Sequence, residues 1–361
     1  MTHRPVACWP RMARPQPGAG SGRGWPAGLG VTSAQAAQLL RLLAACGLRL
    51  TACRFPLAAY SLPCPACGLL ARWFGQPDNV TMRTPAPFLL DWLHAISALA
   101  RHAGSVVMAV YATDFAVQGK ADASPVTLAD AQAEAVILAG LQALTPDIPV
   151  VAEEAAAAGL APQVGANGRF WLVDPLDGTR EFVARNGQFT VNIALIEHGR
   201  PLLGVVLAPA INNRGGGEGG DGGDGGAGQT GVLYAGLVGH GAWVEDSAGR
   251  RPIHCRVVPA AGLTVLASRS HGDAAALDAY LAGRRVAQLG TAGSSLKLCL
   301  LAAGQADLYP RLGRTMEWDI AAGHAVLAAA GGSVCRIDNG APLAYGKPGY
   351  ENPHFVAAGL G

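Results

Sequence analysis

The sequence predicts a mixed α/β (α+β) protein in which layered sheets pack with helices between them. Half of the 361 residues are hydrophobic, which is enough material for a large core. Strand-like and helix-like patterns are mixed without regular alternation, which argues against a simple doubly wound sheet. No internal repeat is visible, and arginines interrupt the best apolar stretch, between Ala36 and Ala59, so no transmembrane segment is expected.

Apolar periodicity and turn residues locate the individual elements. From Leu89 to Val110, apolar residues recur every three or four positions, which predicts a long amphipathic helix over about 88–111. An alanine-rich helix begins at Asp319 and is stopped by Gly331-Gly332. Further helices are expected over about 127–144, from about 273, and over about 293–303. Strands are expected at 149–152, 170–173, 190–196, 202–207, 232–235, 242–245, 263–267, 306–309, 334–337 and 355–358.

Residues 1–81 differ from the rest of the chain. Up to position 77 they hold eight arginines and no acidic residue, and the stretch to Gly30 has no periodic apolar face, which predicts disorder. Such a composition resembles a transit peptide. It equally fits upstream sequence translated from a start codon placed too early, with Met82 as the true start. The second explanation is favoured, because nothing that follows needs this segment.

The chain after residue 77 is acidic. Its 25 acidic residues face 19 basic ones, the 27 of the whole chain less the eight arginines, so its formal charge is about −6. This charge argues against binding nucleic acid by phosphate neutralisation and suits a site that gathers cations. Between Gly215 and Gly228, ten of 14 residues are glycine, which predicts a flexible surface insertion over 214–230.

A strand followed by an acidic turn lies within residues 170–182. Four bulky apolar residues predict a buried strand that ends at Asp174-Pro175, and a tight turn closed by Gly178 presents Asp177 beside it. Two carboxylates so close repel each other unless a cation lies between them, and such ligands suit Mg²⁺ that also holds a phosphate. Thr179 starts a short helix whose free amides suit an anion. An ordinary structural turn is the alternative.

Three further acids stand at a strand end or a helix start. Glu153 ends a strand, Asp130 lies in the first turn of a helix, and Asp319 begins another. Asp130 and Asp319 could each be an ordinary helix cap. If instead Glu153 and Asp319 converge on the acidic turn, the four acids would supply a two- or three-metal cluster of the kind that cleaves phosphate esters.

Eight motifs together resemble those of the inositol monophosphatase superfamily, and most closely its CysQ branch of bacterial 3′(2′),5′-bisphosphate nucleotidases. The resemblance covers about Thr84 to the C-terminus, but neither residues 1–81 nor the glycine-rich insertion. The motifs are KADASPVTLAD at 120–130, EE at 153–154, DPLDGT at 174–179, GQFTVNIAL at 187–195, SRSH at 268–271, GSSLK at 293–297, LYPR at 308–311 and WDIAAG at 318–323.

The resemblance implies the fold and its division. The fold would be the layered α-β-α-β-α sandwich of the inositol monophosphatase and fructose bisphosphatase type. One phosphatase domain would span 82–361, with a metal-binding part over about 82–260 and a nucleotide-binding part over about 261–361.

The resemblance also implies metal ligands. Glu153, Asp174 and the backbone carbonyl of Leu176 would bind a first Mg²⁺. Asp174, Asp177 and Asp319 would bind a second, and a third ion would be held more loosely.

Catalytic and substrate-binding residues are implied in the same way. Asp130 would orient the hydroxyl of Thr179, and this pair would activate the attacking water, since a positioned acid–base pair accelerates such a step. The amides of Gly178 and Thr179 would receive phosphate oxygens. The pocket for the nucleotide and its second phosphate would consist of Ser270, His271, Ser295, Lys297 and Arg311.

The implied activity is magnesium-dependent, lithium-sensitive removal of the 3′-phosphate of adenosine 3′,5′-bisphosphate, giving AMP and phosphate, in sulfur assimilation and nucleotide recycling. Hydrolysis of inositol monophosphate or a sugar bisphosphate is the alternative. A further alternative is a metal-binding regulatory protein that has lost catalysis, and the presence of both Asp130 and Thr179 argues against it. The implied partner is a small molecule and not nucleic acid, in the cytoplasm. Peripheral association with the cytoplasmic face of the inner membrane and homodimerisation stay open.

Overall fold

The computed structural model describes residues 87–113, 117–119, 125–164, 168–211, 231–268 and 274–360. Two predicted features, the disordered start over 1–81 and the insertion over 214–230, lie outside the described residues. The larger sheet has seven strands in the order β3-β4-β5-β6-β7-β8-β9, antiparallel except for the pair β3 and β4. Its strands are β3 (Val150–Ala152), β4 (Arg169–Asp177), β5 (Thr190–Glu197), β6 (Arg200–Ala208), β7 (Val232–Leu237), β8 (Gly241–Asp246) and β9 (Gly249–Ile253).

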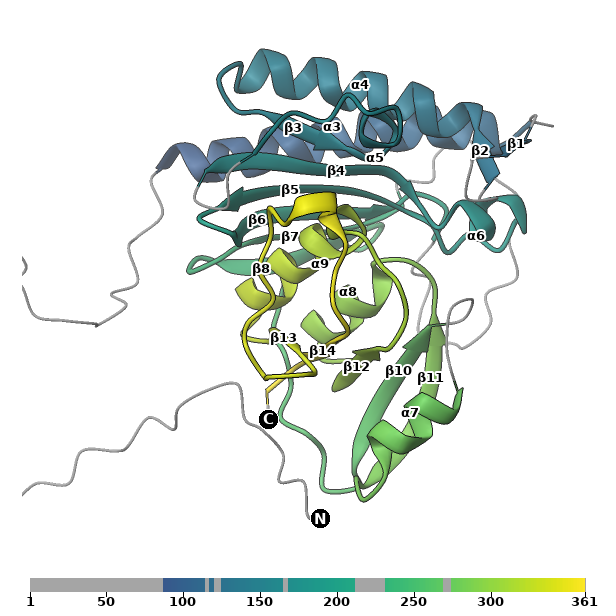
Figure 1. Ribbon diagram of the computed structural model, residues 1–361, viewed down its shortest axis with the longest axis vertical. Helices are drawn as coiled ribbons and strands as arrows, with labels where there is room; N and C mark the ends of the chain where they lie inside the picture. The colour runs from purple at the N-terminus through teal and green to yellow at the C-terminus, as the bar shows by residue number, and fades with distance from the viewer. Residues whose placement is uncertain are drawn as a thin grey trace, which may run out of the picture. The chain divides into compact units, whose positions relative to one another are not determined.

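Helices cover both faces of this sheet (Figure 1). Along β4, Trp171 and Val173 join the apolar cluster of α3 (Pro87–Tyr111) and α4 (Leu128–Leu144). The alternate residues Phe170 and Leu172 join the cluster of α8 (Leu296–Ala302) and α9 (Glu317–Ala329). Successive side chains of a strand point to opposite faces, so β4 is apolar from Phe170 to Val173 because both of its faces are buried there.

The smaller sheet has five strands in the order β11-β10-β12-β14-β13. Helix α9 contacts β6 of the larger sheet and β13 of the smaller one, so it lies between the two. Helix α7 (Ala274–Leu281) connects the parallel strands β10 and β11, and none of residues 274–281 is buried, as expected of an outer layer. The predicted layered α/β fold is confirmed. The strands are β10 (Leu263–Ser268), β11 (Val286–Ala292), β12 (Leu308–Arg311), β13 (Ser333–Arg336) and β14 (Phe355–Ala358).

Four short elements complete the described chain. These are two strands that pair antiparallel, β1 (Val117–Gly119) and β2 (Pro125–Thr127), counted as one hairpin, together with the helix α5 (Glu153–Ala157), the helix α6 (Thr179–Val183) and the 3-10 turn η1 (Pro348–Tyr350). Helices α5 and α6 each follow directly on a strand of the larger sheet, and both carry candidate site residues.

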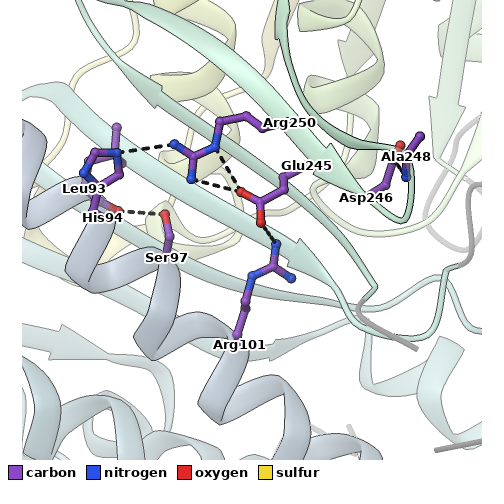
Figure 2. Close-up of polar contacts among 8 residues, drawn as sticks. All are labelled: Leu93, His94, Ser97, Arg101, Glu245, Asp246, Ala248 and Arg250. Carbon is purple, nitrogen blue, oxygen red and sulfur yellow. Dashed lines mark hydrogen bonds and ion pairs between the residues drawn. The ribbon is translucent and has the colours of Figure 1, made fainter. Parts of the chain in front are cut away.

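Helix α3 is held to the larger sheet by its apolar face and by charges. By length and composition it is the one helix among the described residues that could cross a membrane, but its Leu93 and Ile96 are fully buried against the sheet. On its outer side, Arg101 Nη2 donates to Glu245 Oε1 (2.9 Å), and Arg250 on β9 donates twice to Glu245 Oε2 (3.0 Å each) (Figure 2). We call Arg101, Glu245 and Arg250 the surface charge cluster.

Candidate active site

Strand β4 delivers two of the candidate acids to one end of the larger sheet. The sequence predicted that this strand ends at Asp174-Pro175, but β4 continues to Asp177. The register against β5 shifts between Asp174 and Asp177, and no pairing is recorded for Pro175 or Leu176 in between. This irregularity lets the strand pass a proline, which has no N–H for the ladder.

The turn after β4 requires a glycine. Gly178 has φ +91°, in the left-handed region, and a Cβ there would lie 2.6 Å from Ser294 Oγ. Helix α6 starts immediately after it, with the Phe182 amide donating to the Gly178 carbonyl (2.9 Å). The hydroxyl of Thr179 donates to the carbonyl of Leu176 (3.4 Å), so this candidate catalytic hydroxyl stays beside the candidate carbonyl ligand.

Three other elements contribute the remaining acids. Asp130 lies buried in the first turn of α4, and Glu153 is the first residue of α5, directly after β3. Asp319 is the third residue of α9 and accepts a hydrogen bond from the Met316 amide (2.9 Å). Asp319 is therefore in part the helix cap that was the alternative, because one of its carboxylate oxygens accepts a hydrogen bond from the amide that precedes its helix.

The five acids share one electrostatic environment. Burial raises the pKa of Asp174 well above its usual value, and the negative charges of Glu153, Asp177, Asp319 and Asp130, in that order, raise it further. Burial likewise raises the pKa of Asp177 to about 6 and that of Asp319 to about 8. Lys297 and Arg311 oppose these shifts at Asp177 and Asp319 respectively without cancelling them. We call Asp130, Glu153, Asp174, Asp177 and Asp319 the acid cluster.

The donors of the acid cluster fit a hard divalent cation. Asp130 and Asp174 are buried, whereas Glu153, Asp177 and Asp319 are half-buried, so the cluster is closed at its base and open on one side. Mutual repulsion of like charges away from water is what a cation between them relieves. Among the described residues, no three Asp, Glu, His or Cys side chains already form a metal-holding group. Ion binding would therefore require these side chains to turn toward a common point.

Asn192 and Ser295 form hydrogen bonds that connect Asp177 with Asp319. Asn192 was not among the predicted site residues. The side-chain amide of Asn192 on β5 donates to Asp177 Oδ2 (3.4 Å) and to Ser295 Oγ (3.0 Å). The Ser295 amide also donates to Asp177 Oδ2 (2.7 Å), and its hydroxyl donates to the Asp319 carbonyl. A polar residue inside the otherwise apolar strand 190–196 was the signal that could have identified Asn192.

The cationic residues predicted to bind substrate are buried in this structure. Lys297 donates to the carbonyls of Ala292 (3.0 Å) and Ser294 (2.7 Å), which fixes the turn before α8. Arg311 donates to Ser268 Oγ (2.9 Å) and to the Arg314 carbonyl (2.6 Å). Two predicted pocket residues, Ser270 and His271, lie outside the described residues.

Comparison with known proteins finds relatives along most of the described chain. A sequence model of the inositol monophosphatase family matches residues 90–359. The chain is 47% identical over 266 residues to the 3′(2′),5′-bisphosphate nucleotidase CysQ of Escherichia coli strain K12, covering 73% of this chain and 98% of that protein. It is 39% identical over 274 residues to the nucleotidase of the same name from Buchnera aphidicola, covering 74% and 94%.

Solved structures agree with this likeness. The crystal structure of CysQ from Bacteroides thetaiotaomicron matches with a TM-score of 0.59 and 31% identity, over 74% of this chain and 97% of that one. An inositol monophosphatase from Anabaena (Nostoc) sp. PCC 7120 matches with a TM-score of 0.55 and 24% identity, over 75% and 92%, which shows the fold alone.

Proposed function

Because this chain belongs to the inositol monophosphatase family, we propose that it is a 3′(2′),5′-bisphosphate nucleotidase. It removes the 3′-phosphate of adenosine 3′,5′-bisphosphate to give AMP and phosphate, and thereby serves sulfur assimilation and nucleotide recycling. The observation that carries this proposal is the alignment with the nucleotidase of E. coli over nearly that protein's full length.

The proposal includes Mg²⁺ as the cofactor, two or three ions in number. Glu153, Asp174 and the Leu176 carbonyl would hold one ion, and Asp174, Asp177 and Asp319 a second. The raised pKa values of Asp174, Asp177 and Asp319 support this assignment, because a cation between such acids would stabilise their ionised forms. Bound Mg²⁺ would supply positive charge to the phosphate oxygens as negative charge develops on the leaving group.

The chain's own groups orient the reacting atoms. We assign Asp130, buried at the start of α4, to orient the hydroxyl of Thr179, which in this structure donates to the Leu176 carbonyl and would turn toward Asp130 in the working site. The pair would then remove a proton from the attacking water. Gly178 and Thr179 begin α6, and the first amides of a helix have no partner within it, so they are available to phosphate oxygens. Ser295, Lys297 and Arg311 complete the substrate pocket together with Ser270 and His271.

The domain organisation and location are part of the same proposal. One phosphatase domain spans 82–361, a proposal that the family match over 90–359 supports. The proposed location is the cytoplasm, either free or peripherally on the cytoplasmic face of the inner membrane, and the proposed oligomeric state is a monomer or a homodimer. Sedimentation of the purified protein, with and without lipid vesicles, distinguishes these states.

The test compares phosphate release by the full chain from three substrates at equal concentration. We expect adenosine 3′,5′-bisphosphate to be hydrolysed roughly tenfold or more faster than inositol 1-phosphate and fructose 1,6-bisphosphate, because a site built for a base and second phosphate leaves polar groups unpaired with the smaller substrates. Activity should disappear with EDTA and fall with lithium. A faster rate on inositol 1-phosphate would favour the alternative activity within the superfamily.

A further inference from the structure

Helix α4 carries a second buried acid one turn after Asp130. Glu134 follows Asp130 by four positions, so the two side chains lie on the same face of the helix, and both are buried. The sequence analysis gave Glu134 no role.

The carboxylate of Glu134 binds the start of another helix. The Glu154 amide donates to Glu134 Oε2 (2.9 Å), and the Ala155 amide donates to Glu134 Oε1 (3.0 Å). Both amides belong to the first turn of α5, which has no capping side chain at Ala152 in the described structure. Glu134 therefore supplies from α4 the acceptors that the short helix α5 lacks at its own start.

The residue that α5 presents first is Glu153, a member of the acid cluster. Its backbone directly precedes the two amides that Glu134 holds, so the position of Glu153 depends on those hydrogen bonds. Asp130 and Glu134 are in turn fixed to each other by one turn of α4. One helix thus sets the distance between two acids that the chain separates by 23 positions.

We propose that Glu134 is a positioning residue, which fixes Glu153 on α5 relative to Asp130 on α4 through the two amide hydrogen bonds. This inference rests on the proposed function for its catalytic consequence, because Glu153 is assigned there as a ligand of Mg²⁺. The effect on Mg²⁺ binding does not depend on the identity of the substrate, because Glu134 only positions the carboxylate of Glu153 for a divalent ion.

The test is Glu134→Gln in the full chain, which keeps the shape of the side chain but leaves one of the two amides without an acceptor. We expect the dissociation constant of Mg²⁺, measured by calorimetry without substrate, to rise about tenfold, as is typical for partners that orient metal ligands. The Mg²⁺ concentration for half-maximal activity should rise in parallel, with KM for the nucleotide changed less than about twofold.

Asp307→Asn is the matched control. Asp307 is also buried, and it accepts hydrogen bonds from the Thr264 amide (2.7 Å) and from the Arg256 side chain. Neither of these partners is a candidate site residue. This variant should lower the melting temperature at least as much as Glu134→Gln and leave the Mg²⁺ dissociation constant unchanged.

A double variant separates positioning from general stability. In a Glu153→Gln background, Glu134→Gln should weaken Mg²⁺ binding no further, since the ligand that it positions is already lost. If Glu134→Gln lowers the melting temperature and leaves Mg²⁺ binding unchanged in the calorimeter, the inference is overturned. If the wild-type chain binds Mg²⁺ but does not hydrolyse the nucleotide, the proposed function fails while the role of Glu134 is still decided by calorimetry.

Discussion

The pKa values of carboxylates are shifted in opposite directions in the acid cluster and in the surface charge cluster. In the acid cluster, burial and neighbouring carboxylates raise the pKa of Asp174, and one lysine does not restore Asp177 to its usual value. At the surface, burial also acts to raise the pKa of Glu245, but hydrogen bonds and charges from Arg250 and Arg101 outweigh it, and the pKa is lowered (Figure 2). Arginines therefore compensate the charge of Glu245, which links α3 to the larger sheet, whereas the acids at the proposed Mg²⁺ site are compensated only in part.

The largest effect on activity is expected from a substitution within the acid cluster. Asp174→Asn should lower kcat/KM by about 10³-fold or more, because an ion of this kind contributes several kcal/mol at the transition state and each 1.4 kcal/mol is a factor of ten. Phosphate release at saturating Mg²⁺ measures it.

The control for this variant is Glu245→Gln in the surface charge cluster, which should keep nearly full activity. The metal-free Asp174→Asn protein should melt no lower than wild type, because a repelling charge has been removed. A large fall in melting temperature would instead show that Asp174 serves the fold.

The pH dependence of stability distinguishes the two clusters next. Asp177 and Asp319 have folded-state pKa values of about 6 and about 8, above the usual 3.8. The folded state therefore binds more protons than the unfolded state, so the metal-free protein should lose stability as pH rises from about 4 to about 8. Thermal unfolding in EDTA measures this fall, and saturating Mg²⁺ should flatten it. A metal-free melting temperature that rises over this range would contradict the pKa assignments.

A pair of glycine substitutions compares the backbone of the two regions. Gly178→Ala in the acidic turn should destabilise the protein by about 2–3 kcal/mol and lower activity, because it adds a close contact with Ser294 to a left-handed φ. Gly249, at the start of β9, has φ +100°, but no atom lies within 4 Å of the Cβ that alanine would add. Gly249→Ala should therefore lower the free energy of unfolding by only about 1 kcal/mol. Urea unfolding compares the two, and equal costs would argue against the contact.

The smallest effect is expected in the surface charge cluster. Arg101→Ala should lower the free energy of unfolding by about 0.5 kcal/mol, because partly exposed ion pairs contribute little. The loss should shrink in 1 M salt, which screens such pairs. Urea unfolding at low and high salt measures it, and a loss that is independent of salt would indicate packing of the arginine stem instead.

The sequence predicted the central strands of each sheet and one of the two edge strands, and it missed the other edge strand. The apolar runs of β4, β5 and β6 were located to within a few residues, since strands buried on both faces leave a strong pattern. The edge strands β3 and β13 were predicted because they include buried apolar residues, whereas the edge strands β9 and β11 were not. Most residues of β9 and β11 are not buried, so no apolar pattern marks these two strands.

A similar division applies to the candidate site. The acids Asp174 and Asp177 were identifiable because their turn chemistry is local, and Asp319 because it heads a helix. Glu134 and Asn192 were missed because their hydrogen-bond partners lie 15 or more positions away. The polar side chain in an apolar strand marks Asn192 as unusual, but it does not tell which residues Asn192 binds. The resemblance implied that Lys297 lies in the substrate pocket, but the direction of its ammonium group toward the carbonyls of Ala292 and Ser294 is a tertiary property.

The placement of β14 has a consequence for the stability of the candidate site. Residues 355–358 form a strand that lies between β12 and β13 and pairs with both. Without this strand, β13 would lose its neighbour in the smaller sheet, and helix α9, which bears Asp319 and packs on β13, would lose part of its support. Deletion of residues 355–358 should therefore inactivate the protein although it removes no residue assigned to catalysis.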